Sequence, residues 1–124
     1  MYVLKFTSEA LADIKTIPKH FKGPLKKALL EKVAVEPHDC SHELHEELNG
    51  YRSFTWREYR FVYRVFDDLK AVVVVGLGLR SAKSKENIYR RLETLVRTGK
   101  LAQGMLFSLR GFTESDAGKR RGKD

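Results

Sequence analysis

Apolar residues recur at every third or fourth position in three segments of the chain, and this spacing predicts helices. The segments are residues 8–17, 21–35 and 83–98. Thr7 or Ser8 can cap the first helix, and Pro18 ends it. Pro37 follows the second helix and Gly99 follows the third, as expected of residues that stop helices. The first two helices are close enough in sequence to form a helical hairpin.

Four other segments are rich in β-branched and aromatic residues or alternate apolar and polar ones, which favours strands. They are residues 2–6, 51–56, 59–66 and 71–78. The valine run at 72–75 indicates a strand that is buried on both faces. The order β-α-α-β-β-β-α predicts an α+β fold, in which a small antiparallel sheet carries the N-terminal helical hairpin on one face. We expect the other face to carry the arginines of the central strands.

The chain is predicted to form one domain over residues 1–98, followed by a C-terminal extension over residues 99–124. The extension begins with apolar residues that can form a short docked element, and one hypothesis places this element over the helical hairpin. Its basic end, residues 118–124, is expected to be disordered. The apolar residues are Leu101, Met105, Leu106, Phe107, Leu109 and Phe112.

Positive charge is concentrated in the second part of the chain. Residues 1–50 carry a formal net charge of −1, residues 51–124 carry +9, and the whole chain carries +8. This asymmetry indicates an anionic partner such as nucleic acid, an acidic protein or a membrane surface. We expect no membrane insertion, because no apolar run is long enough and the N-terminus lacks a signal-peptide layout. Cys40 is the only cysteine, which fits a cytoplasmic protein without an intrachain disulfide.

Arginine and aromatic residues alternate irregularly between positions 50 and 66. The arginines are Arg52, Arg57, Arg60 and Arg64. Guanidinium groups form paired hydrogen bonds with phosphate, and aromatic rings stack on unpaired bases. The segment therefore indicates a surface that binds a polyanion such as RNA. The alternative is a strand pair with a solvated arginine face.

The polar loop at 37–50 supplies candidate acids and bases. Histidine transfers protons near neutral pH, so His42 or His45 can serve in this way, and Glu43 is a candidate carboxylate beside them. The alternative is a surface loop with solvated side chains. The spacing of the histidines and Cys40 matches no usual zinc layout, and we expect neither a metal site nor a cofactor.

Three motifs follow one another in a distinctive order. A short strand and a helical hairpin come first, then Leu48-Asn-Gly-Tyr-Arg-Ser53 with Tyr59-Arg-Phe-Val-Tyr63 after it. An apolar strand that ends in Gly76-Leu-Gly-Leu-Arg80 is third, and Tyr89 follows it. In this order the chain resembles the RelE/ParE superfamily of toxins from bacterial toxin–antitoxin modules, over roughly residues 1–95.

The resemblance to RelE-like members implies a metal-independent endoribonuclease that cleaves mRNA on the ribosome and leaves a cyclic phosphate. It assigns Arg60 and Arg80 to stabilising the phosphate and its transition state, and Tyr89 to base stacking or proton transfer. Two of them have a structural alternative, since Arg60 can pair with Glu58 or another nearby acid and Tyr89 can be an ordinary tyrosine of the last helix. Further contacts with RNA are expected from Arg52, Arg57, Lys83 and Lys85.

One position departs from the RelE-like pattern. Phe54 stands where such members carry a lysine with an acid/base role, and we expect Phe54 to pack or stack instead. A ParE-like inhibitor of DNA gyrase without catalytic activity is therefore the first alternative, and an attenuated homologue that only binds its antitoxin is the second. All three functions imply a cognate antitoxin as partner. The endoribonuclease would also bind the ribosome and mRNA, and the ParE-like inhibitor would also bind DNA gyrase.

Overall fold

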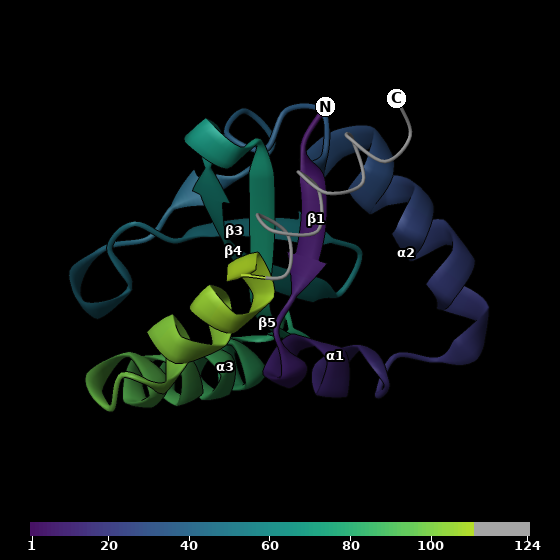
Figure 1. Cartoon of the computed structure of the whole chain (residues 1–124). Helices are drawn as coiled ribbons and strands as arrows, with labels where there is room; N and C mark the ends of the chain where they lie inside the picture. Colours follow the sequence, from purple (N-terminus) through teal and green to yellow (C-terminus); the bar gives the residue numbers. More distant parts are fainter. Residues whose placement is uncertain (111–124) are drawn as a thin grey trace, which may run out of the picture.

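A five-stranded sheet forms the centre of the protein (Figure 1). The computed structural model describes residues 1–110, apart from the side chains of residues 82 and 84–86. The strands are β1 (Val3–Phe6), β2 (His42–Glu43), β3 (Arg52–Trp56), β4 (Tyr59–Phe66) and β5 (Ala71–Leu79), in the spatial order β1-β5-β4-β3-β2. The α-helices are α1 (Ser8–Ile14), α2 (Lys22–Ala28) and α3 (Ala82–Arg97), and residues 100–110 are also helical.

The predicted α+β fold is confirmed, with one difference in the sheet. β1 runs parallel to β5, with Val3 opposite Ala71 and Phe6 opposite Val74, whereas the other neighbouring strands are antiparallel. The pattern of a strand of four residues carries no information about the direction of its partner. The sheet is therefore mixed, and the first strand lies beside the last.

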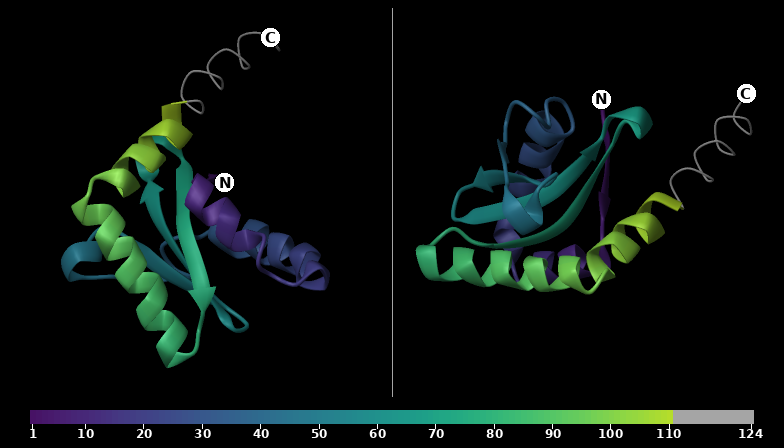
Figure 2. Two further views of the ribbon diagram at one scale, coloured as in Figure 1. Left: turned by 90° about the horizontal axis from the view of Figure 1, so that it is seen from below. Right: turned by 90° about the vertical axis from the view of Figure 1, so that its left-hand side faces the viewer.

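Two helical layers cover opposite faces of this sheet (Figure 2). On the face that we call the hairpin face, Ala10 of α1, Leu25 of α2 and Leu29 of the π-helical turn Leu29–Val33 that continues α2 are buried in one cluster with Phe61 and Val74. On the α3 face, α3 buries Ile88 and Leu92 against the sheet. The expectation that this face carries the arginines holds for Arg60 and Arg64 of β4, although most of the face is apolar and covered by α3.

The extension contributes to the covering of the α3 face. Within the 100–110 helix Leu101, Met105 and Leu109 are buried, while Leu106 and Phe107 are exposed. The buried side chains join the cluster around Ile88 and Leu92 and not the one beneath the helical hairpin, so the hypothesis of docking over that hairpin was wrong. Phe112 and the basic tail lie outside the described residues, and the boundary between domain and extension stays a prediction.

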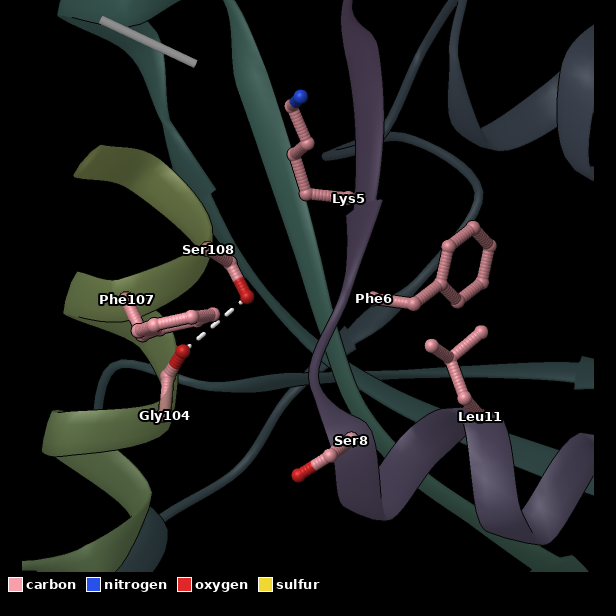
Figure 3. A pocket seen from close by; sticks show the side chains of 7 residues that line it. All are labelled: Lys5, Phe6, Ser8, Leu11, Gly104, Phe107 and Ser108. Atoms are coloured by element: carbon pink, nitrogen blue, oxygen red, sulfur yellow. Dashed lines mark hydrogen bonds between the residues drawn. The ribbon is translucent and has the colours of Figure 1, made fainter. Parts of the chain in front are cut away.

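A hollow of about 490 Å³ separates the 100–110 helix from β1 and α1 (Figure 3). Lys5 and Leu11 line it on one side, and Phe107 and Ser108 line it on the other. The Ser108 hydroxyl donates a hydrogen bond to the carbonyl of Gly104 at 3.0 Å. The shared hollow places this helix beside the edge strand β1.

Within the described residues, no helix is both long and apolar enough to cross a membrane.

Glycines in β5 allow α3 to approach the sheet closely. A Cβ atom placed on Gly78 would lie 3.0 Å from the Cβ atom of Ile88, and one on Gly76 would lie 3.2 Å from side-chain carbons of Ile88 and Leu92. Contacts this short require the neighbouring side chains to give by a few tenths of an ångström. The two glycines thus set the distance between β5 and the helix that carries Tyr89.

Candidate functional site

Arg57 and Arg80 lie at one end of the sheet. The pair Trp56 and Tyr59 closes the β3–β4 hairpin, which leaves only two residues in the turn. Arg57 takes a left-handed conformation there with a φ of 52°, which suits short hairpin turns even without glycine. The backbone N–H of Arg80 donates a hydrogen bond to the carbonyl of Glu58 and holds the end of β5 against this turn.

A surface hollow of about 470 Å³ lies between these two segments. It is lined by Arg57, Glu58, Leu79, Arg80 and Ser81. Both arginines are exposed, and neither forms an ion pair with Glu58 or another acid in the described part of the chain. Two guanidinium groups at one hollow favour the binding of phosphate.

Arg60 lies on β4 between Thr55 of β3 and Gly78 of β5. Its Nε atom is buried and has no hydrogen-bond partner among the described residues. The alternative of pairing with Glu58 was wrong, since these two residues form no ion pair in this structure. A buried donor without a partner costs about 1–3 kcal/mol, and such groups often mark a binding site. An anionic ligand would satisfy it.

Tyr89 reaches from α3 to the sheet. Its hydroxyl donates a hydrogen bond to Ser53 Oγ at 3.4 Å. His42 is the cross-strand partner of Ser53, so both side chains belong to the same face of the sheet. Ser53 and Thr55 are two residues apart on β3, which separates the His42–Ser53 row from the Thr55–Arg60 row by about 7 Å. The α3 face thus carries Tyr89, Ser53 and His42 as well as Arg60.

Arg52 and Glu43 lie on the hairpin face instead, because Arg52 is opposite Tyr63 and Glu43 is opposite Arg52. Arg52 Nε donates to Ser41 Oγ at 2.6 Å, and its Nη2 donates to the His38 carbonyl at 2.9 Å. Glu43 lies 3.5 Å from its Nη1 atom. Arg52 therefore holds the loop before β3, and the geometry does not bring Arg52 and Glu43 to the hollow lined by Arg57 and Arg80.

Tyr63 of β4 holds the same loop through a buried hydrogen bond. Its hydroxyl donates to the carbonyl of Pro37 at 2.7 Å, and burial raises the pKa of this hydroxyl. It therefore stays protonated and keeps its donor role. The tyrosine at the end of the Tyr59–Tyr63 motif therefore has a structural role, and no functional role is needed to explain it.

The remaining sequence candidates have simpler positions. Lys83 is exposed in the first turn of α3, and the side chain of Lys85 lies outside the described residues. Phe54 is buried on the hairpin face with its ring centroid 6.3 Å from that of Phe61, so the prediction that it packs is confirmed. Among the described residues, no group of three His, Cys, Asp or Glu side chains is arranged to hold a metal ion.

Two features of the site could not be predicted from the sequence. Ser53, the contact of Tyr89, is a serine in a strand and carries no signal of its own. The second is the contact among Phe21, Trp56 and Arg57, which depends on the helical hairpin lying beside the β3–β4 turn. Only the three-dimensional structure joins residues so far apart in the sequence.

Comparisons with known proteins match this arrangement. Residues 4–83 fit the model of the family described as "ParE toxin of type II toxin-antitoxin system, parDE". The toxin RelG of Mycobacterium tuberculosis is 28% identical over 90 residues, which are 73% of this chain and 98% of RelG.

Solved structures give the same result. The RelBE2 toxin–antitoxin complex of M. tuberculosis contains a chain with a TM-score of 0.60 and 26% identity, over 64% of this chain and 98% of that one. The isolated RelE toxin of E. coli has a TM-score of 0.55 and 29% identity, over 73% and 98% of the two chains. Each relative is matched over nearly its whole length, whereas this chain extends beyond the match. Tyr89 lies outside the segment that fits the family model.

Proposed function

The chain belongs to the ParE toxin family of type II toxin–antitoxin systems within the RelE/ParE superfamily, and we propose that it is a ribosome-dependent mRNA endoribonuclease. The observation that carries this proposal is the α3 face of the sheet, which carries Arg60 with its buried and unpartnered Nε atom and also carries Tyr89, Ser53 and His42. The similarity to RelG and RelE supports it.

The proposed reaction uses the 2′-hydroxyl of the RNA as the nucleophile. Its oxygen attacks the adjacent phosphorus, the bond from phosphorus to the 5′-oxygen breaks, and a 2′,3′-cyclic phosphate and a 5′-hydroxyl form. A base must take the 2′ proton, and an acid must supply one to the leaving 5′-oxygen. His42 and Tyr89 are the acid/base candidates on the α3 face, while Arg60 and Arg80 stabilise the charge on the phosphorus centre.

Glu43 and Arg52 have no part in this proposal, because they bind each other on the hairpin face. Arg57, Lys83 and Lys85 are proposed to contact the RNA backbone. Arg57 lines the hollow with Arg80, and Lys83 is exposed only three residues beyond Arg80. Such contacts supply affinity that falls with rising salt.

An antitoxin is the second proposed partner. The M. tuberculosis relative was solved as a toxin–antitoxin complex, and this family consists of toxins from such systems. The net charge of +8 favours an acidic antitoxin segment.

The alternative function is inhibition of DNA gyrase without catalysis, and two observations favour it. The matching family model describes ParE toxins, and Phe54 is a core residue where RelE-like members carry a lysine. Expression in cells separates the two functions. An endoribonuclease truncates mRNA, detected by primer extension, and leaves plasmid supercoiling unchanged in a gyrase assay. Intact transcripts in growth-arrested cells would refute the proposal, and inhibited supercoiling would then support the alternative.

A further inference from the structure

Beside the hollow that Arg57 and Arg80 line, the tip of the β3–β4 hairpin carries a group of aromatic rings. We propose that Trp56, Phe21 and Arg57 form a stacking site for one unpaired base of the bound RNA. The inference rests on the proposed function, since it adds a base-recognition site to the same substrate. It names Trp56 as a residue that contributes to affinity and base preference.

The rings come from two layers of the fold. Phe21 belongs to the 3₁₀ turn Lys19–Phe21, which enters α2, and Trp56 is the last residue of β3. Their centroids are 6.1 Å apart with an edge-to-face angle of 86°, and Trp56 stacks on Tyr59 at 6.4 Å. Phe21 and Trp56 are only partly buried, whereas Tyr59 beneath them is 9% exposed. Tyr59 thus supports the platform, and the other two rings reach the surface.

Arg57 lies over both of these partly buried rings. Its Cζ atom is 4.9 Å from the centroid of Trp56 and 5.3 Å from that of Phe21. No ion pair or hydrogen bond holds its guanidinium within the described part of the chain. At an exposed site such a cation–π contact is worth only about 0.5–1 kcal/mol. A base that stacks on Trp56 can therefore displace the guanidinium.

The displaced guanidinium has a second place to bind. Arg57 also lines the hollow that contains Arg80, so its cation can move to a phosphate held there. A ligand that satisfies both features carries a flat aromatic group beside a phosphate, with the base free of pairing. A nucleotide of single-stranded RNA has this chemistry, and aromatic side chains commonly stack on such bases.

The chain offers a direct measurement, because Trp56 is its only tryptophan. A short single-stranded oligoribonucleotide is titrated into the full-length protein, and the tryptophan fluorescence is recorded. An oligomer of the same length with abasic riboses is the control for phosphate binding alone. We expect quenching with the first and little with the second, and about tenfold weaker binding of the abasic oligomer.

Two variants complete the test, with binding measured by the anisotropy of a labelled oligomer. Trp56→Phe keeps a ring and should bind within about threefold of the wild type, whereas Trp56→Leu should bind about tenfold more weakly. Thermal unfolding identifies any loss of folding in Trp56→Leu. Equal affinity for the normal and abasic oligomers, without quenching, would overturn the proposal even if Trp56→Leu unfolds.

The outcomes also separate this inference from the proposed function. If the wild-type protein cleaves mRNA and Trp56→Leu cleaves it with unchanged affinity and sequence preference, the stacking site is wrong and the nuclease stands. If the wild type shows base-dependent quenching but no cleavage, the stacking site stands and the proposed reaction is wrong.

Discussion

The Asp13 carboxylate of α1 binds the Arg91 guanidinium of α3 across the uncovered edge of β5. The same Oδ2 atom accepts a hydrogen bond from the backbone N–H of Leu77 at 3.0 Å. β1 pairs with β5 only as far as Val74, so this N–H has no strand partner on that side. Asp13 therefore closes the edge of the sheet and ties together the helices on its two faces. One of these helices carries Tyr89.

Replacing Asp13 should loosen this tie. We expect Asp13→Ala to lower the free energy of unfolding by about 1–3 kcal/mol, because a partly buried N–H and a guanidinium both lose a charged acceptor. Arg91→Ala should lower the free energy of unfolding less, since the Asp13 carboxylate still accepts the hydrogen bond from the Leu77 N–H. Urea unfolding of both variants and of the double variant gives the coupling energy. Glu31→Ala removes the exposed Lys27–Glu31 pair and serves as control, with an expected change below about 0.5 kcal/mol. Additive effects of Asp13→Ala and Arg91→Ala would contradict the tie.

Gly78→Ala should displace α3. The added methyl group would meet the Cβ atom of Ile88 at 3.0 Å, and this atom can give by the few tenths of an ångström required only if the α3 backbone moves with it. The expected loss of stability is about 1–3 kcal/mol. Gly23→Ala is the matched control, because open space surrounds Gly23 in α2 and alanine favours helix by about 1 kcal/mol. Thermal unfolding compares the two variants. A Gly78→Ala protein as stable as Gly23→Ala would show that the close approach is unimportant.

Much of this fold was predictable from local pattern. The β4 strand at 59–66 and the start of β5 at Ala71 follow the predicted bounds, because β-branched and aromatic residues are dense there. The strand β2 was missed, since His42 and Glu43 are two polar residues that pair only through the position of β3. The parallel pairing of β1 with β5 could not be predicted either, because it depends on the tertiary fold and not on the residues of β1.

The site was predictable only in part, and for the same reason. Motif order pointed to Arg60, Arg80 and Tyr89, but the sequence could not say which arginines share a face. Arg52 differs from Arg60 in this respect because its cross-strand partner, Tyr63, points toward the helical hairpin. Pairing register, and not composition, decides which cations lie together.

The Tyr2–Asp67 hydrogen bond should give stability a defined pH dependence. The Tyr2 hydroxyl donates to Asp67 Oδ1 at 2.6 Å. This hydrogen bond lowers the pKa of Asp67, and the contact with His38 lowers it further. The same Tyr2–Asp67 hydrogen bond raises the pKa of Tyr2. A lowered carboxyl pKa stabilises the fold above about pH 4, and the effect is lost as the pH falls through the folded value. The raised pKa of Tyr2 stabilises the fold below about pH 10, and this stabilisation is lost as the pH rises through the pKa of Tyr2 in the folded protein.

Urea unfolding of Tyr2→Phe across pH values tests this directly. The difference in stability from the wild type should be constant from about pH 5 to 9 and should shrink at both extremes. Asp68→Asn, at the exposed neighbouring carboxylate, is the control and should leave the Tyr2→Phe difference unchanged. A difference that stays constant down to about pH 2 would show that the bond does not perturb Asp67.

The 100–110 helix should contribute to stability through its buried side chains. Leu101 is 2% exposed and Leu106 is 67% exposed, so one helix supplies both test and control. We expect Leu101→Ala to cost about 2–4 kcal/mol and Leu106→Ala less than about 0.5 kcal/mol, measured by urea unfolding. Equal, small effects would mean that the helix is not docked in solution.

The central claim is that Arg60 stabilises the transition state of mRNA cleavage on the ribosome. The most direct measurement is primer extension on a defined mRNA incubated with purified ribosomes and the wild-type, Arg60→Ala or Arg64→Ala protein. Arg64 is the matched control, since it lies on the same strand and face but stands over Tyr51 and Phe66. We predict ribosome-dependent cleavage by the wild type, a loss of about 100-fold or more in Arg60→Ala, and near-normal cleavage by Arg64→Ala. Intact mRNA with the wild type, or equal cleavage by Arg60→Ala, would contradict the claim.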